Sequence, residues 1–248
     1  MPRYDFDAPR LYVEDALDES AELALSREQA NYLVNVLRLG PADCVLAFNG
    51  RDGEWRARLE RRSPKNVVLC VEAQVRAQHT GCDLHYLFAP LKHARLDYMV
   101  QKAVEMGASR LQPVITRRTQ ASRVNLDRMR ANAIEAAEQC GILVLPEIGE
   151  PLPLDRLIDA WPTDRLLVFC DEDAPVRDPL AALAAALPQP RPLALLVGPE
   201  GGFDADERAR ITRLPSSVAV SLGPRILRAD TAAVAALALI QAVVGDWR

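Results

Sequence analysis

The chain has 248 residues, of which 49% are hydrophobic and only 5% aromatic, and its formal net charge is −4. This length fits one large domain or two small ones, and the hydrophobic fraction excludes a globally disordered chain. The negative total charge argues against a uniformly basic surface, so any contact with RNA must come from a local patch.

The five cysteines and three histidines show no spacing typical of a metal site or a disulfide framework. None of the cysteines lies within four residues of another, so the chain has no CxxC pair. We therefore expect no metal, and reduced thiols suit a cytoplasmic protein. The longest apolar run, Ala232 to Ile240, is far shorter than the ~20 residues of a membrane span. We expect no membrane association.

Residues 1–75 contain short apolar runs separated by Gly, Pro and Asn turn signals. Trp55 to Leu59 alternates with a period of two, as a half-buried strand does. The segment from Ser26 to Leu37 is expected to form one helix, because a capping serine begins it. This region therefore predicts a small β-rich domain with the shape of a barrel, and the polar residues 76–81 predict a linker.

Residues 82–248 alternate apolar strands with helices, a pattern that predicts an α/β domain with a mainly parallel sheet. Gly107 and Gly141 follow two of the expected helices at positions typical of helix-ending glycines. Asp204 and Glu207 form a capping pair at the start of another. The expected strands are 84–89, 111–115, 143–148, 166–169, 193–197 and 218–222, and the expected helices are 95–106, 126–140, 180–187, 205–213 and 231–244.

An apolar strand runs directly into a glycine-rich turn in residues 195–204, which read LLVGPEGGFD. Such glycines permit positive φ angles and let a ligand approach the backbone. The helix that follows offers free N–H groups to an anion or a polar ligand. GPEGG lacks the GxGxxG spacing of a dinucleotide fingerprint, which argues against an NAD-type oxidoreductase. On its own, such a turn is often only structural.

A second expected strand ends in a Gly-Pro loop in residues 221–233, which read SLGPRILRADTAA. The helix that follows is apolar on nearly every face, so it must be buried inside the domain or against a partner. Asp230 is either the N-cap of this helix or a functional residue. Arg228 borders the same buried helix, and for this residue a functional role is favoured over a solvated one.

These two segments closely resemble the C-terminal signature of the RsmE family, 16S rRNA uracil-N3 methyltransferases of the SPOUT superfamily. Segments 36–39, 101–107 and 135–140 resemble the family in the same order along the chain. The resemblance implies a PUA-like, RNA-binding β-barrel over 1–75, a linker over 76–81 and a SPOUT α/β domain over 82–248. It also implies a deep trefoil knot at approximately 193–244, a homodimer, and S-adenosylmethionine (SAM) as cofactor.

The resemblance further implies the reaction and its residues. The substrate is N3 of a specific uridine, U1498, in 16S rRNA of the small ribosomal subunit, in the cytoplasm. Arg228 is the expected catalytic arginine, and Asp230 or Glu200 takes the proton from N3, with no choice between them from sequence. The expected cofactor-binding residues are Val197, Gly198, Pro199, Glu200, Gly201, Leu222, Gly223, Ile226, Leu227 and Glu172.

Two basic clusters are candidate RNA contacts. Residues 51–65 hold six basic residues against three acidic ones, with Trp55 among them, and residues 116–130 hold a second cluster. Without the resemblance, both clusters fit ordinary solvated faces. With it, the residues expected to bind RNA are Arg38, Arg56, Arg58, Arg61, Arg62, Arg117 and Arg118.

Three other functions remain open at this point. The first is another SPOUT RNA methyltransferase with a different target RNA or base, which only a substrate assay separates from the family's reaction. The second is an NAD-type oxidoreductase built on the α/β domain, and the third is a catalytically inactive RNA-binding module. The absent GxGxxG motif argues against the second, and the intact glycine-rich loops argue against the third.

Overall fold

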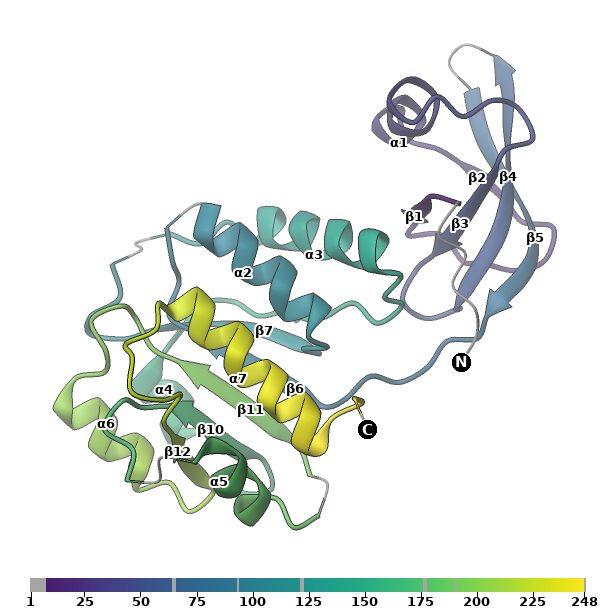
Figure 1. The fold of residues 1–248 in the computed structure, drawn as a ribbon. Coiled ribbons are helices and arrows are strands. Elements are labelled where there is room, and N and C mark those ends of the chain that lie inside the picture. Colours follow the sequence, from purple (N-terminus) through teal and green to yellow (C-terminus); the bar gives the residue numbers. More distant parts are fainter. Residues whose placement is uncertain are drawn as a thin grey trace. The chain divides into compact units, whose positions relative to one another are not determined.

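The computed structural model describes residues 8–63, 66–92, 94–120, 123–175, 178–189 and 191–247. The chain divides into two compact units, which Figure 1 shows as ribbons. The first unit comprises Met1–Thr80 and Ala137–Leu145, and the second comprises Gly81–Ala136 and Pro146–Arg248. The first unit is therefore assembled from two separate stretches of sequence.

The first unit is built on a five-stranded sheet, which confirms the prediction of a β-rich region. Its strands are β1 (Arg10–Tyr12), β2 (Glu22–Ala24), β3 (Cys44–Phe48), β4 (Glu54–Ser63) and β5 (Asn66–Arg76), in the order β1-β3-β4-β5-β2. The β1–β3 pair is parallel and the other pairs are antiparallel. In β4, Ala57 and Leu59 are buried while Arg56 and Arg58 are exposed, as the period of two requires.

The helix expected over residues 26–37 is divided into two elements. Helix α1 (Arg27–Asn31) begins at a capping box made by Ser26, as predicted. The next residues, Tyr32–Val36, form a π-helix (η1), in which the N–H of Leu37 donates to the carbonyl of Tyr32 at 2.9 Å. The chain then takes a positive φ of 59° at Arg38, a conformation that ends the helix and that non-glycine residues adopt rarely.

The 137–145 stretch is held to the first unit by contacts with its strands. Glu138 Oε1 accepts a hydrogen bond from the backbone N–H of Tyr12 at 2.8 Å. Arg76 donates to the carbonyl of Gly141 at 2.9 Å, and its guanidinium also lies 3.3 Å from the buried carboxylate of Glu54. The stretch is therefore an integral part of the unit in which it lies.

The second unit is a mainly parallel sheet covered by helices, as the sequence predicts. Its strands are β6 (Leu84–Phe88), β7 (Arg110–Ile115), β8 (Glu147–Ile148), β9 (Leu152–Pro153), β10 (Leu166–Cys170), β11 (Leu193–Val197) and β12 (Ser217–Val220). The order is β12-β10-β11-β6-β7-β8, with β9 paired to β7, and every pair is parallel. Burial on both faces explains why β11 is a continuous apolar run.

The helices of this unit cover both faces of the sheet (Figure 1). They are α2 (Ala94–Glu105), α3 (Leu126–Cys140), α4 (Leu154–Asp159), α5 (Pro179–Ala186), α6 (Ala205–Thr212) and α7 (Ala229–Val244). Helix α7 packs on α2, α5 and β11, whereas α4 packs on α6 and β7. On the α2 side the buried Tyr86 hydroxyl lies 2.9 Å from Sδ of Met99, and on the α4 side Leu87 packs with Leu154 and Ile211.

One sequence expectation in this unit is wrong, and one of two alternatives that the sequence left open is excluded. The strand expected over residues 143–148 is reduced to Glu147–Ile148, because Leu143 is buried in the core of the first unit and Pro146 lacks an N–H for a ladder. Helix α7 begins at Ala229, with Arg228 as its N-cap, so Asp230 lies inside the first turn and is not the cap. The helix-ending role of Gly107 and Gly141 is confirmed by φ angles of 76° and 63°.

Candidate functional site

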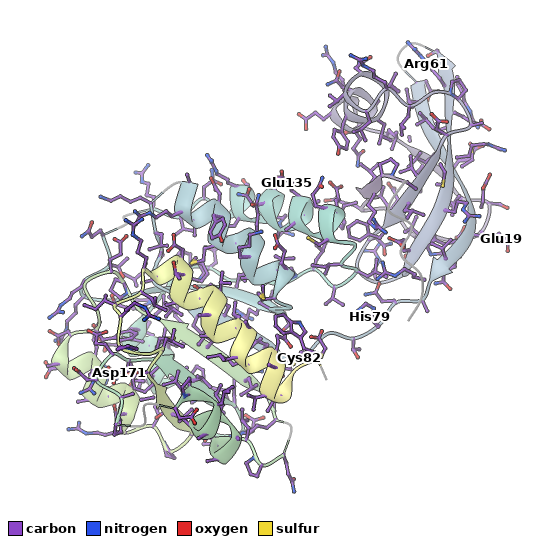
Figure 2. All side chains as sticks on the ribbon, in the orientation of Figure 1. Glu19, Arg61, His79, Cys82, Glu135 and Asp171 are labelled. Atoms are coloured by element: carbon purple, nitrogen blue, oxygen red, sulfur yellow. The ribbon has the colours of Figure 1, made fainter. Side chains whose placement is uncertain are left out.

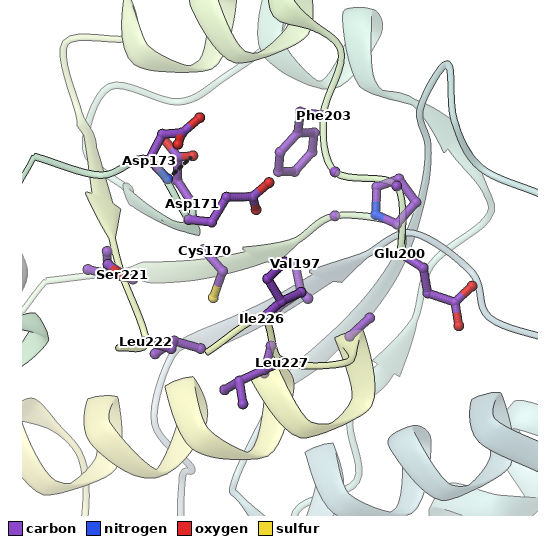
Figure 3. A pocket seen from close by; sticks show the side chains of 18 of the residues that line it. Cys170, Asp171, Asp173, Val197, Glu200, Phe203, Ser221, Leu222, Ile226 and Leu227 are labelled. Atoms are coloured by element: carbon purple, nitrogen blue, oxygen red, sulfur yellow. Dashed lines mark hydrogen bonds between the residues drawn. The ribbon is translucent and has the colours of Figure 1, made fainter. Parts of the chain in front are cut away.

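Three loops meet at the carboxyl ends of β10, β11 and β12. The three strands are neighbours and run parallel, with β10 in the middle, so the loops that follow them emerge at one edge of the sheet. Between these loops lies a pocket of about 280 Å³, which Figure 3 shows from close by. Open α/β sheets bind their ligands at this edge. The fold therefore places a ligand site where the two signature segments lie.

All of the residues expected to bind the cofactor line this one pocket, although they come from three stretches of sequence. The assignment of each residue to the cofactor stays a prediction, whereas their meeting is a fact of the fold. The residues are Val197, Gly198, Pro199, Glu200, Gly201, Leu222, Gly223, Ile226, Leu227 and Glu172.

The first of the three loops, residues 198–204, is named here the glycine loop. A Cβ atom on Gly198 would lie 2.9 Å from Cε2 of Phe203, so only glycine leaves room for that ring. Phe203 in turn packs edge-to-face on Phe169 of β10, with the ring centroids 6.4 Å apart. Gly202 takes a positive φ of 69°. The turn is therefore closely packed on its inner side and needs glycine for two separate reasons.

Helix α6 begins at the end of the glycine loop with the capping box that the sequence predicts. The carboxylate of Asp204 accepts a hydrogen bond from the N–H of Asp206 at 3.0 Å, and Glu207 accepts from the N–H of Asp204 at 3.0 Å. The backbone hydrogen bond from Asp206, together with the positive charge of Arg117, lowers the pKa of Asp204. This carboxylate therefore stays ionised and fixes the direction in which the loop enters the helix.

The second loop, residues 221–228, is open on its outer side. Gly223 has a positive φ of 98°, and a Cβ atom there would meet nothing within 4 Å. The side chain of Ile226 is 91% exposed at the rim of the pocket, which is unusual for isoleucine. The loop thus presents apolar side chains and accessible backbone next to an empty volume.

The third loop contributes an ion pair, between a buried carboxylate and a partly exposed arginine, that sequence reasoning missed. The carboxylate of Asp171, almost fully buried, lies 2.8 Å from Nε of Arg208 on α6, and Arg208 also donates to the carbonyl of Asp173. Cys170 lies on the floor of the pocket, and burial raises the pKa of its thiol to about 12, so it stays protonated. Asp171 and Arg208 are 37 positions apart in sequence, so no local signal indicates this contact.

The three catalytic candidates lie in different settings. Glu200 lines the pocket, but its carboxylate points away from the centre (Figure 3) and lies 2.5 Å from Nη1 of Arg95. Arg228 is exposed, and within the described part of the chain its guanidinium has no hydrogen bond or ion pair. Asp230 is half-buried and accepts a hydrogen bond from the N–H of Thr231. Arg228 and Asp230 flank Ala229, which lines the pocket.

The candidate RNA contacts are divided between the two units. Arg38, Arg56, Arg58, Arg61 and Arg62 are exposed residues of the first unit, and Figure 2 labels Arg61 on β4. Arg58 and Arg62 are each paired with carboxylates, Arg58 with Glu60 and Glu72 and Arg62 with Glu22. Arg117 and Arg118 follow β7 in the second unit, where they contact the glycine loop.

Over the residues whose positions the structure gives, no three His, Cys, Asp or Glu side chains are grouped so that they could hold a metal ion. Within the same ranges, no helix has the length and apolar character required to span a bilayer.

Comparison with known families covers nearly the whole chain. A family model described as an RNA methyltransferase domain matches residues 78–241, and one described as an RNA methyltransferase PUA domain matches residues 25–71. Ribosomal RNA small subunit methyltransferase E of Synechocystis is 31% identical over 96% of this chain and 78% of its own length. The Rickettsia conorii protein of the same name is 29% identical over 94% of each chain.

Solved structures agree with these relatives. A ribosomal RNA small subunit methyltransferase E from Neisseria gonorrhoeae, bound to S-adenosyl methionine, superposes with a TM-score of 0.85 at 25% identity, over 97% of this chain and 100% of its own. A putative methyltransferase from Legionella pneumophila, in complex with SAM, gives 0.79 at 29% identity, over 96% and 99%. With its PUA-like first unit and its SPOUT-type α/β unit, the chain belongs to the family of ribosomal RNA small subunit methyltransferase E.

Proposed function

We propose that this protein transfers a methyl group from SAM to N3 of a uridine in 16S rRNA, the nucleotide U1498 for which the family is known. The observation that carries the proposal is the meeting of three signature loops around one pocket at the carboxyl edge of the sheet. Family membership supports the substrate class, and the pocket supports the cofactor.

The residues of the pocket fit SAM, which carries a positive sulfonium and an ammonium group. The lining contains the acidic residues Asp171, Glu172, Asp173 and Glu200 against the basic Arg208 and Arg225, and Arg208 is already paired with Asp171. A negative lining suits a cation and disfavours the pyrophosphate of a dinucleotide. The open space beside Gly223 leaves backbone groups of the second loop accessible to a ligand.

SAM supplies an electrophilic methyl group, so the protein mainly has to align a nucleophile with it. Uracil N3 carries a proton at neutral pH. A base must remove this proton, and a cation must stabilise the negative charge that develops on the ring. Arg228, whose guanidinium has no partner among the residues that the structure describes, ends the second loop next to the pocket-lining Ala229 and can bind O2 or O4 of the base. Asp230 and Glu200 are the two candidates from sequence for the proton acceptor, and the pairing of Glu200 with Arg95, away from the pocket centre, favours Asp230. The target base must be unpaired or flipped out.

The proposed RNA partner is 16S rRNA in the small subunit, which implies action in the cytoplasm. The arginines of β4 lie on a surface where a phosphate backbone can reach them. A homodimer is proposed because α7 carries half-exposed apolar side chains, among them Val234 and Leu239, and because its neighbour α2 exposes Tyr98. A partner subunit would cover this surface.

The domain limits are also proposals: a PUA-like domain over 1–75, a linker over 76–81, a SPOUT domain over 82–248 and a knot at approximately 193–244. The strand order supports the knot. After β11 the chain passes β10 to form β12 at the edge of the sheet, and α7 then returns to pack on β11. Such a return path, threaded past the loops of β10 and β11, is rare in proteins.

The test is mass spectrometry of 16S rRNA nucleosides from a strain that lacks the gene. We expect 3-methyluridine to disappear from this rRNA and to return when the wild-type gene is restored. Purified protein should also methylate small subunits from that strain, but not subunits in which the target uridine is replaced by cytidine. Loss of a methyl group at another base or in another RNA would instead identify a different SPOUT methyltransferase and overturn the uridine proposal.

A further inference from the structure

Arg118 binds the backbone of the glycine loop directly. Its Nη1 atom donates to the carbonyl oxygen of Gly201 at 2.6 Å, and the two residues are 83 positions apart in sequence. The aliphatic part of the same side chain covers the loop as well, because a Cβ atom on Gly201 would lie 3.6 Å from Cδ of Arg118. The contact therefore restrains both the polar backbone and the outer surface of the turn.

Arg117 holds the end of the same loop. Its guanidinium lies 2.6 Å from the carboxylate of Asp204 and 3.0 Å from that of Asp206. Its backbone N–H donates to Glu207 at 2.7 Å, and Glu207 is buried at 4% exposure. The turn that follows β7 is thus joined to the first turn of α6 by both backbone and side-chain contacts.

Arg95, in the first turn of α2, holds the middle of the loop from another element. Its Nη1 atom lies 2.5 Å from Oε1 of Glu200. Arg95, Arg117 and Arg118, together named here the arginine clamp, contact the loop at three successive points, Glu200, Gly201 and Asp204. Two of these contacts use exposed ion pairs, and the third uses a backbone carbonyl, which cannot be altered by substitution of the loop residue.

We infer that the arginine clamp positions the glycine loop for cofactor binding, so that Arg118 and its two neighbours act on cofactor affinity even without RNA. This inference rests on the proposed function, since it assumes that SAM occupies the pocket. The loop is packed on its inner side, but its three glycines would leave its outer side, from Glu200 to Gly202, with many conformations, which are lost when a ligand binds. Contacts that hold the loop beforehand reduce that cost.

The clamp gives Arg117 and Arg118 a role that differs from RNA binding in its kinetic signature. A residue that binds only RNA phosphates changes the Michaelis constant for RNA and leaves cofactor affinity unchanged. A residue that positions the loop raises the Michaelis constant for SAM and leaves turnover at saturating SAM nearly unchanged, because the reacting groups are not altered. The Michaelis constants for RNA and for SAM, measured on one set of variants, therefore distinguish RNA binding from positioning of the loop.

The experiment measures binding of S-adenosylhomocysteine to the purified full chain by calorimetry, with no RNA present. An exposed ion pair, as at Arg95, and a single exposed hydrogen bond to a carbonyl, as at Arg118, each contribute little, so Arg95→Gln and Arg118→Gln should each weaken binding about two- to fivefold, and the double variant about tenfold. Arg118→Lys keeps a charged donor and should restore part of the loss. Arg156→Gln is the matched control, because Arg156 is an exposed arginine of α4 that lies outside both basic clusters and has no hydrogen bond or ion pair with the glycine loop, all of whose residues the structure describes.

Thermal unfolding midpoints of the variants should match that of the wild type, since the side chains of Arg95 and Arg118 are exposed. Michaelis constants for SAM should rise in parallel with the dissociation constants for S-adenosylhomocysteine. The Michaelis constant for RNA should stay unchanged in Arg95→Gln. Wild-type affinity in the Arg95/Arg118 double variant would overturn this inference but leave the proposed function standing. Failure of the wild type to bind S-adenosylhomocysteine would overturn the proposed function and the inference with it.

Discussion

The guanidinium of Arg95 lies 2.5 Å from the carboxylate of Glu200, and this ion pair turns Glu200 away from the centre of the pocket that its own loop lines. Glu200 was one of two candidates for the group that takes the proton from the target base. Its orientation and its partner fit a side chain that fixes the loop. A base, in contrast, must lie within hydrogen-bond reach of the proton that it removes.

The first prediction follows from this pair. Glu200→Gln should keep the single-turnover rate at saturating SAM within about threefold of wild type, because no reacting group is lost. The same variant should raise the Michaelis constant for SAM about two- to fivefold through the weaker contact with Arg95. Single-turnover methylation of small subunits gives both values. A fall in the rate of a hundredfold or more would assign the proton transfer to Glu200 after all.

A second prediction compares two glycines of the glycine loop. Gly198→Ala should lower the free energy of unfolding by about 1–3 kcal/mol, because its Cβ would lie 2.9 Å from the ring of Phe203 and overpack the turn. It should also weaken cofactor binding, since the loop must shift. Gly201→Ala is the matched control, with its Cβ at an ordinary 3.6 Å from Arg118. Chemical denaturation and calorimetry of the two variants check the difference, and equal effects would contradict it.

A third prediction concerns Arg228, whose guanidinium is free of partners among the residues that the structure describes. If this cation stabilises charge that develops on the uracil, it acts mainly in the transition state. Arg228→Ala should then reduce single-turnover methylation roughly 10²–10³-fold, with cofactor affinity little changed. Arg228→Lys should recover only part of the rate, because an ammonium lacks the planar fork. Turnover at the wild-type rate in the alanine variant would make Arg228 a structural residue.

A fourth prediction separates two neighbouring arginines on one face of β4. Arg56 has no carboxylate partner in the described part of the chain, whereas Arg58 is paired with Glu60 and Glu72. A phosphate contact by Arg56 releases a counterion, so Arg56→Gln should lower the slope of log affinity against log salt by about one unit. Arg58→Gln should change it less, because nearby carboxylates already balance its charge. Filter binding of 16S rRNA over a salt series measures both, and equal slopes would refute the distinction.

The features that sequence predicts well are those fixed by local chemistry. The capping boxes at Ser26 and Asp204 and the positive φ angles of Gly107 and Gly141 depend on residues a few positions apart, and all four are confirmed. That the two signature segments share a cofactor site was implied by the resemblance to the RsmE family, and each segment does follow an apolar strand of the parallel sheet.

The features that sequence did not predict depend on contacts between distant residues. The apolar run from Ile142 to Leu145 has the composition of a strand, but Leu143 is buried in the first unit and does not pair in a sheet. Arg118 and Gly201 are separated by 83 residues, and their contact leaves no periodicity or motif in either segment. Charge clustering together with the family resemblance therefore gave Arg118 an RNA role, and neither could indicate its place on the glycine loop.

The β-rich first unit includes residues 137–145 from the middle of the sequence, and this limits how the unit can be transferred to another protein. A fragment that stops after Thr80 lacks the 137–145 stretch and, with it, the carbonyl of Gly141 that accepts from Arg76. In the intact protein the side chain of Arg76 is only 10% exposed, and in the fragment its guanidinium would lose this hydrogen-bond partner. A graft of the first unit onto another enzyme must therefore carry the end of α3 as well. Natural recombination at a single crossover point between the two stretches would separate them and leave the unit incomplete.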